Sequence, residues 1–192
     1  MITPGATVIS AAQPPAVTAV IEETCRQQGA DLHWVAPLPD DWQLGLAGVM
    51  QRHNAAVARA ALQALEPLGW TVDENAIRCG FAEARWPGRL QSARWQNHPL
   101  LLDGAHNPPA AAQLALERGR WPGEDAGVCW ILAMQAHKQA PAMLEHLLDP
   151  SDRAWIVPVP DHHSWTRSRL AEQCPQWHNQ LLEADSGEAA LL

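Results

Sequence analysis

Short apolar runs alternate along the chain with longer stretches in which apolar residues recur at helical spacing or alanine is abundant. The apolar runs predict strands at residues 6–10, 32–35, 99–103, 128–134 and 153–159. The longer stretches predict helices over residues 14–28, 49–65, 73–84, 107–118, 139–148 and 166–174. Two helix boundaries are clearly marked, because Gly29 follows one helix and Asn107 with Pro108 begins another.

The second half of the chain repeats the strand–helix order three times. This order predicts an α/β fold, with a parallel sheet covered by helices. The run at residues 99–103 is continuously apolar, so we expect this strand to be buried on both faces of the sheet. The segment Trp86-Pro87-Gly88-Arg89 interrupts the helical pattern before that strand and predicts a domain boundary after residue 86.

Charge and composition exclude several classes of function. The net charge of −8 argues against nucleic acid as a partner, because phosphate binding requires clustered cations. Lys138 is the single lysine, and neither a glycine-rich turn nor a following Ser or Thr accompanies it, so the chain contains no P-loop. The four cysteines form no C-x-x-C pair, which favours reduced thiols in the cytoplasm. The sequence has neither a signal peptide nor an apolar run that could span a membrane.

Polar side chains follow the predicted strands of the second half, where open parallel sheets bind ligands. These groups are Asp103-Gly104-Ala105-His106-Asn107, Gln135-Ala136-His137-Lys138 and Asp161-His162-His163-Ser164. A carboxylate fixed at a strand end, such as Asp103, can accept hydrogen bonds from the hydroxyls of a ribose. Alternatively, Asp103 caps its own turn and His106 is simply solvated. The residue pattern by itself leaves both interpretations open.

Other candidate residues have ordinary structural explanations. His162 and His163 are adjacent and lack an H-x-x-x-H or H-E-x-x-H partner, so their spacing argues against a metal site, and we predict no metal ligands. Asn54 would ordinarily be a solvated helix residue, and Arg89 a surface charge. Trp86 and Pro87 would ordinarily form a packing hinge.

Three segments together resemble a known family. Arg85-Trp86-Pro87-Gly88-Arg89 is followed by Leu101-Leu102-Asp103-Gly104-Ala105-His106-Asn107-Pro108, and this pairing resembles the C-terminal half of folylpolyglutamate synthase/dihydrofolate synthase, a branch of the Mur ligase superfamily. Upstream, Gly48-Val49-Met50-Gln51-Arg52-His53-Asn54-Ala55 is similar to the family's G-x-H-Q-x-x-N-A helix, with Met50 where His is usual. The resemblance extends over nearly the whole chain and thins after about residue 165.

The resemblance implies an enzyme that uses ATP and Mg²⁺ to join L-glutamate to the carboxylate of folate or dihydropteroate through an acyl phosphate. It also implies site residues. Asn54 matches a residue near the adenine, Arg89 one that reaches the nucleotide phosphates, and Asp103 the carboxylate that holds the ribose hydroxyls. His106, our candidate catalytic residue, matches one that helps to position the glutamate. Lys138 stands near the family's D-K-D segment without its two Asp, so its role stays open.

The same comparison predicts how the chain is organised. Residues 1–86 are expected to be the C-terminal part of the central ATPase domain, and residues 87–192 a Rossmann-like Mur ligase C-terminal domain that lacks its last strand and helix. The family's phosphate loop, Mg²⁺ ligands and modified lysine would precede Met1. We therefore expect a fragment, inactive alone, of a cytoplasmic ligase that is monomeric at full length. The alternatives are a non-catalytic nucleotide-binding module and another Mur-type amino-acid ligase.

Overall fold

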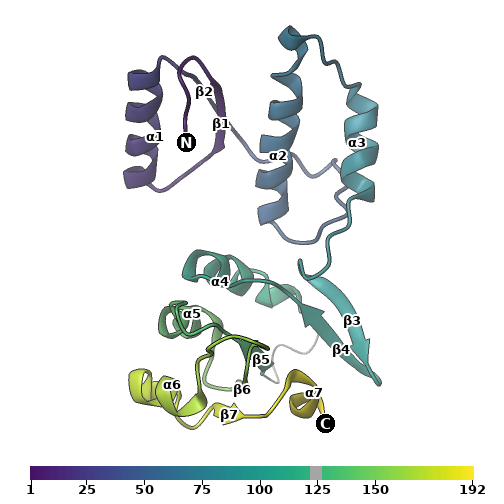
Figure 1. Ribbon diagram of the computed structural model, residues 1–192. Helices are drawn as coiled ribbons and strands as arrows, with labels where there is room; N and C mark the ends of the chain where they lie inside the picture. The colour runs from purple at the N-terminus through teal and green to yellow at the C-terminus, as the bar shows by residue number, and fades with distance from the viewer. Residues whose placement is uncertain (122–126) are drawn as a thin grey trace. The chain divides into compact units, whose positions relative to one another are not determined.

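The chain forms two compact units in a computed structural model that describes residues 1–121 and 127–192 (Figure 1). The first unit spans residues 1–91 and the second spans residues 92–192. The division therefore falls a few residues beyond the boundary predicted after residue 86. No helix in the described part of the chain is long and apolar enough to cross a membrane.

The first unit begins with a β-α-β arrangement. Strand β1 (Thr7–Ala11) pairs in parallel with β2 (Asp31–Val35), and helix α1 (Pro15–Gln28) connects them. Pro15 occupies the first helical position, where its missing N–H costs nothing. Gly29 ends α1 in the left-handed conformation, with φ of 59°. All three elements confirm the predictions from the apolar pattern.

Two helices complete the first unit and lie side by side (Figure 1). They are α2 (Met50–Gln63) and α3 (Glu74–Glu83), joined by the short 3-10 helix η1 (Glu66–Leu68). Asp73 caps α3, because its carboxylate accepts the N–H of Asn75 at 3.0 Å. The core between the helices is built around buried Leu38, Trp42, Ala56 and Ile77.

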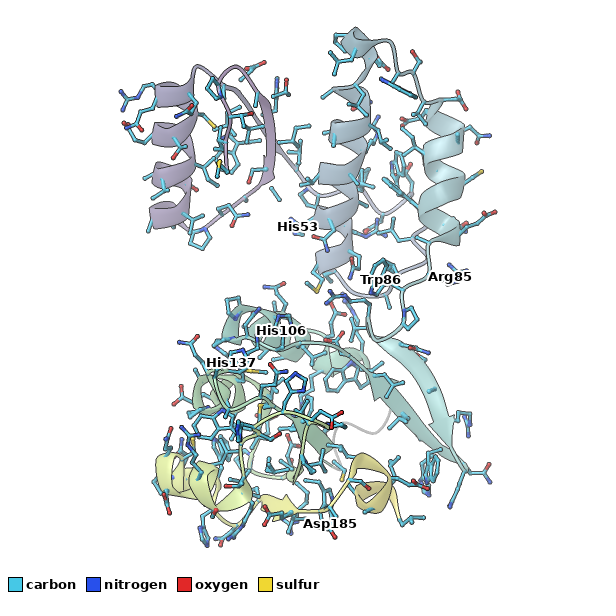
Figure 2. All side chains as sticks on the ribbon, in the orientation of Figure 1. His53, Arg85, Trp86, His106, His137 and Asp185 are labelled. Carbon is cyan, nitrogen blue, oxygen red and sulfur yellow. The ribbon has the colours of Figure 1, made fainter. Side chains whose placement is uncertain are left out.

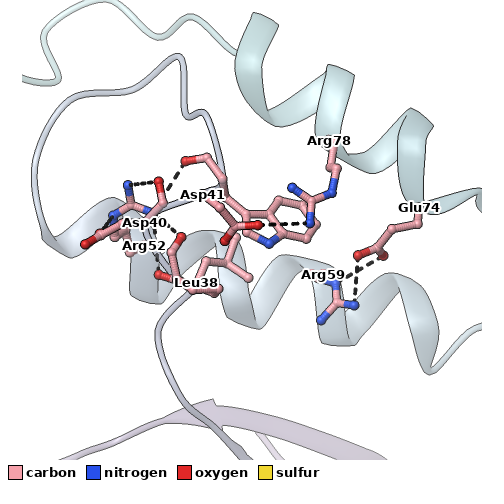
Figure 3. A network of polar contacts seen from close by, with 9 residues as sticks. Leu38, Asp40, Asp41, Arg52, Arg59, Glu74 and Arg78 are labelled. Atoms are coloured by element: carbon pink, nitrogen blue, oxygen red, sulfur yellow. Dashed lines mark hydrogen bonds and ion pairs between the residues drawn. The ribbon is translucent and has the colours of Figure 1, made fainter.

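Three arginines fix the loop that leads into α2 (Figure 3). The guanidinium of Arg78 lies 4.0 Å from the centre of the Trp42 ring, and that of Arg59 lies 5.3 Å from it. Arg59 also pairs with Glu74 at 2.9 Å, which links α2 to α3. Arg52 donates to the carbonyl oxygen of Pro39 at 2.6 Å. These contacts hold the loop against the helices that carry the candidate site.

The second unit contains the predicted parallel sheet. Strands β5 (Cys129–Ala133), β6 (Arg153–Val157) and β7 (Leu181–Glu183) lie in the order β5-β6-β7, and both pairings are parallel. The helices are α4 (Pro108–Ala115), α5 (Ala140–Leu147), α6 (Arg167–Gln173) and α7 (Gly187–Leu191). Figure 1 shows α4, α5 and α6 in a row along one flank of the sheet, with α7 towards the other. The predicted α/β class is confirmed, whereas β7 and α7 are too short to have been recognised in the sequence.

The apolar run at residues 99–103 corrects one prediction. Strand β4 (His98–Leu102) pairs with β3 (Gln91–Trp95) in a separate two-stranded sheet and does not join the parallel sheet. Leu101 and Leu102 are 37% and 41% exposed, so this strand is not buried on both faces. Only two residues separate β3 from β4, and Gln96 adopts a positive φ of 51°, so the nearest partner forms a hairpin.

One buried carboxylate organises the second unit. Asp152 is fully buried and accepts two hydrogen bonds from the Arg118 guanidinium, at 2.6 and 2.7 Å. It also accepts from the backbone N–H of Val128 and Asp149 and from the indole of Trp130. Burial by itself would raise the pKa of Asp152, but these hydrogen bonds outweigh it and lower the pKa to about 2.

Candidate functional site

A hollow of about 340 Å³ lies in the first unit, at the start of α2. It is lined by Leu46, Met50, Gln51, Asn54, Trp86 and Arg89. The volume is at the lower end of the range for small-molecule pockets, which is roughly 300–1,000 Å³. Its wall combines an aromatic ring, an amide and a guanidinium, so it offers a planar apolar surface beside polar groups.

Helix α2 supplies one wall of this hollow. Met50 and Asn54 are four residues apart and Gln51 and Asn54 three apart, so the three side chains share one face of the helix. Asn54 is exposed, whereas Gln51 is only 8% exposed. The Nδ2 amino group of Asn54 donates to Gln51 Oε1 at 3.0 Å. The amide of Asn54 is therefore held by a buried side chain that also lines the hollow.

The segment after α3 supplies two more lining residues, Trp86 and Arg89. Figure 2 labels Arg85 and Trp86 in this segment. Arg85 donates to the carbonyl oxygens of Ala82 and Ala84, at 2.9 and 2.8 Å, which satisfies acceptors at the end of α3. Gly45 lies close to the C-terminal end of α3 and donates its N–H to the carbonyl oxygen of Phe81 at 2.8 Å. Beyond Arg85 the indole of Trp86 is 68% exposed, so it presents a large open ring surface to the hollow.

Arg89 gives the hollow its charge. The ion pairs among residues 1–121 and 127–192 occupy other arginines, such as Arg52 and Arg59, and none of them includes Arg89. Leu90 follows with a positive φ of 43° and a buried side chain, and this costly conformation fixes the turn from which Arg89 projects. In a chain of net charge −8, an arginine without a carboxylate partner suits an anionic ligand.

The second unit holds the other two predicted site residues. Asp103 follows β4, and its Oδ1 accepts the N–H of Ala105 at 2.8 Å. His106 donates from Nδ1 to the carbonyl oxygen of Gly104 at 2.9 Å, which directs Nε2 away from the turn. Both side chains are exposed. The structure thus brings Asn54 and Arg89 together in one hollow and places Asp103 and His106 together in one turn.

Three of the histidines noted in the sequence, His137, His162 and His163, follow β5 and β6. The loops after these strands lie side by side, because the N–H of Ala136 donates to the carbonyl oxygen of His163 at 2.8 Å and the Trp165 indole donates to that of Lys138 at 2.9 Å. Figure 2 shows His137 in this region. Within residues 1–121 and 127–192, no three His, Cys, Asp or Glu side chains come together as a metal site would require.

A second hollow, of about 410 Å³, lies beyond the ends of β1 and β2. Its lining residues are Ala12, Gln13, Thr18, Trp34, Val35 and Ala36. None of these side chains can carry a charge. The smaller hollow, with Arg89, is therefore the better candidate for an anionic ligand.

Two contributors to the site were not identified from the sequence. The sequence pattern assigns no role to Gln51, although its spacing of three residues from Asn54 places both on one helix face. The same pattern predicts a packing hinge at Trp86, but its exposed ring also lines the hollow. Exposure of a large aromatic ring depends on tertiary packing, which no local pattern reveals.

Comparison with known proteins decides the family. The profile described as "Dihydrofolate synthetase, C-terminal domain" matches residues 88–183, which is half of the chain. This match includes the turn that carries Asp103 and His106. The chain belongs to the folylpolyglutamate synthase/dihydrofolate synthase family.

Individual members of the folylpolyglutamate synthase/dihydrofolate synthase family also resemble this chain in sequence and structure. The Bacillus subtilis dihydrofolate synthase/folylpolyglutamate synthase is 40% identical over 77 residues, which are 40% of this chain and 18% of that protein. The Escherichia coli protein of the same name is 30% identical over 173 residues, or 82% of this chain and 40% of that protein. The structure of E. coli FolC in complex with DHPP and ADP matches with a TM-score of 0.70 and 26% identity, over 96% of this chain and 46% of that one. The chain thus spans less than half the length of each of these relatives.

Proposed function

We propose that this chain carries the nucleotide-contacting part of an ATP-dependent ligase that joins L-glutamate to folate or dihydropteroate. The observation that carries the proposal is the hollow that unites Asn54, Trp86 and Arg89. An exposed indole suits stacking against a purine, a held amide suits its polar edge, and a guanidinium suits phosphate oxygens. The ADP bound by the E. coli relative supports the choice of an adenine nucleotide.

The proposed reaction has two steps. A carboxylate oxygen of the folate attacks the γ-phosphorus of ATP, the bond from that phosphorus to the bridging oxygen breaks, and ADP leaves. The amine of glutamate then attacks the acyl carbon, phosphate leaves and the nitrogen loses a proton, which yields an amide. Arg89 would offset negative charge on the nucleotide phosphates, while Asn54 and Trp86 would keep the base in place.

Asp103 and His106 have proposed roles in the same reaction. The carboxylate of Asp103 would accept hydrogen bonds from the ribose hydroxyls. His106 donates from Nδ1 to a backbone carbonyl, so in the neutral ring Nε2 can accept a hydrogen bond from the incoming glutamate amine. This arrangement supports a positioning role during attack on the acyl phosphate.

Mg²⁺ would neutralise charge between the phosphates during the first step. Its usual ligands are carboxylate oxygens and water, and no suitable cluster exists among residues 1–121 and 127–192. We therefore derive no step through the metal from this chain. Residues 1–86 would belong to the central ATPase domain and residues 87–192 to the C-terminal domain. We also propose that the full-length ligase is a cytoplasmic monomer, as the family resemblance implies.

The alternatives are less well supported. A non-catalytic module would bind a nucleotide equally well, but the matched relatives are synthases. Another Mur-type ligase would have a different acceptor, whereas the matched domain is that of a dihydrofolate synthetase. The chain without a P-loop is expected to bind ATP but to form no polyglutamate when it is incubated with ATP, Mg²⁺, a reduced folate and labelled glutamate. Sustained ligation by this chain alone would contradict that expectation.

Replacement of Arg89 by alanine should weaken ATP binding about ten- to a hundredfold, because a charge-assisted hydrogen bond contributes roughly 1.5–3 kcal/mol. Equilibrium dialysis with labelled ATP measures the dissociation constant. Arg94→Ala is a matched control, since Arg94 is also exposed but lies in the hairpin and donates to the carbonyl oxygen of Asn97. Equal losses for the two variants would show a general charge effect and would count against the hollow.

Replacement of Asp103 by asparagine separates its two interpretations. Asparagine keeps an oxygen that can accept the N–H of Ala105, so the turn should persist. The neutral amide is a weaker acceptor for ribose hydroxyls, so ATP affinity should fall several-fold. Unchanged affinity for ATP would count against a role of Asp103 in holding the ribose.

A further inference from the structure

Strands β1 and β2 form a parallel sheet that has few neighbours. Within residues 1–121 and 127–192, no third strand pairs with either of them. Parallel sheets occur almost only in larger α/β structures that bury their strands. Here Cys25 is the single buried residue among residues 1–35. The β1-α1-β2 segment thus buries much less apolar surface than a complete α/β domain, which leaves room for further chain against it.

The two strands of this sheet differ in composition. Strand β1 contains no charged residue, whereas β2 carries Asp31 and His33, and Oδ2 of Asp31 lies 2.9 Å from Nε2 of His33. Interior strands of a parallel sheet are uncharged and mostly apolar, whereas charged side chains are typical of edge strands. The composition therefore indicates that β2 is a true edge strand and that β1 lacks its second neighbour.

The hydrogen bonds of the sheet determine which backbone groups face outward. The N–H of Asp31 donates to the carbonyl oxygen of Ala6 at 2.9 Å, so the backbone groups of these two residues face each other. Successive residues of a strand point their N–H and C=O groups to opposite sides. The backbone groups of Ile9 therefore face away from β2, and those of Leu32 face away from β1. The outer edge of β1 offers the N–H and C=O of Ile9 to a further strand.

The relatives indicate which polypeptide fits this edge. The match to E. coli FolC covers 96% of this chain but 46% of that one, so more than half of FolC has no counterpart here. Because residues 88–183 match a C-terminal domain, the unmatched part lies mainly on the N-terminal side. The family resemblance places the phosphate loop in that part. A P-loop connects a strand to a helix, so the segment that carries it must contain β-strands.

We propose that the outer edge of β1 is a docking surface for the P-loop-bearing segment of a folate–glutamate ligase, which adds a strand beside Ile9. We also propose that this segment can dock as a separate polypeptide, without a covalent link. Addition of a strand to a sheet edge is a common mode of recognition, in which main-chain hydrogen bonds supply affinity. The proposal rests on the proposed function, which assigns phosphate binding to protein outside this chain, and adds the location of the junction.

The test mixes the full chain with the part of E. coli FolC that precedes the match, expressed as a separate polypeptide. Size-exclusion chromatography should show a one-to-one complex. In this complex the amide hydrogen exchange of Ile9, followed by NMR, should slow at least about tenfold, because its N–H gains a partner. Exchange at Leu32 should stay unchanged, since its N–H faces the other edge of the sheet.

Two proline variants locate the junction. Ile9→Pro removes the outward N–H of β1, and proline is tolerated where the N–H of an edge strand faces solvent, so the chain alone should stay folded. Its affinity for the FolC segment should fall at least about tenfold, because the added strand loses a main-chain hydrogen bond and meets the proline ring. Leu32→Pro is the matched control at the outer edge of β2, and its affinity should stay within about twofold of the wild type. Thermal unfolding of each variant alone measures any damage to the fold.

Several results would overturn the docking surface. These are no complex with the wild-type chain, unchanged exchange at Ile9 within the complex, and a loss in Leu32→Pro as large as that in Ile9→Pro. A dimer of this chain that forms without the FolC segment and disappears in Ile9→Pro would show that a second copy occupies the edge instead. Each of these results leaves the proposed function standing as long as the chain alone binds ATP in equilibrium dialysis. Absence of ATP binding would overturn the proposed function.

Discussion

Replacement of Asp152 by asparagine is expected to lower the free energy of unfolding of the second unit by about 3–5 kcal/mol. The fully buried carboxylate accepts both hydrogen bonds from Arg118 and those of Val128 and Trp130. Asparagine removes the charge that pairs with Arg118 and turns an amino group towards one of these donors. The guanidinium would then lose its buried counter-charge and keep only the exposed carboxylate of Asp149, which accounts for the size of the loss.

The same variant should change the response to acid. The pKa of Asp152 is lowered from 3.8 to about 2 in the folded chain, so the carboxylate stabilises the fold fully above the unfolded value. This stabilisation, roughly 2 kcal/mol, is lost as the pH falls from about 4 through about 2. Urea unfolding at neutral pH and at about pH 2 should show the loss in the wild type and its absence in Asp152→Asn.

Asp149 provides the matched control for this experiment. Its carboxylate pairs with Nε of the same arginine, Arg118, at 3.1 Å, but its side chain is 58% exposed. An exposed ion pair contributes little, so Asp149→Asn should cost less than about 1 kcal/mol. Equal losses in the two variants would contradict the special role of the buried carboxylate.

Replacement of Gly45 by alanine should destabilise the first unit by about 1–3 kcal/mol and weaken ATP binding as well. A Cβ at this position would overlap the guanidinium of Arg85 and the carbonyl oxygens of Ala82 and Ala84. Backbone atoms would have to move, and with them the segment that presents Trp86 to the hollow. Thermal unfolding and ATP dialysis measure the two effects.

Gly80→Ala serves as the comparison, because Gly80 lies within α3 and a Cβ there meets nothing within 4 Å. Alanine favours the helix over glycine, so this variant should raise the free energy of unfolding by about 0.5–1 kcal/mol. It should leave ATP binding unchanged. A gain in stability at both positions would show that the close approach of Gly45 to the end of α3 is unimportant.

The sequence predicts most helices because they carry their own boundary signals. Gly29 ends α1, Asp73 begins α3 and Asn107 begins α4 in the way that local capping requires. The pairing of strands is less predictable, since an apolar run indicates burial but names no partner. Strand β4 shows this limit, because a tight turn and an adjacent sequence give it β3 as partner.

Some residues of the candidate site can likewise be predicted from the sequence, whereas others depend on the tertiary structure. Asn54 and Arg89 could be proposed from motifs, and the hollow places them together. Their positions relative to each other depend on the close approach of Gly45 to the end of α3 and on the contact of Arg78 with the Trp42 ring. The sequence does not identify Gln51 as a site residue, because a buried glutamine is usually a packing residue.

The hydrogen bonds to Asp152 also determine how the second unit can move. They come from Arg118 beyond α4, from Val128 and Trp130 at the start of β5, and from Asp149 at the end of α5. If any one of these segments separated from the others, it would expose the buried charge or remove one or more of its donors. We therefore expect local fraying to occur in other parts of the unit, and these three segments to open together.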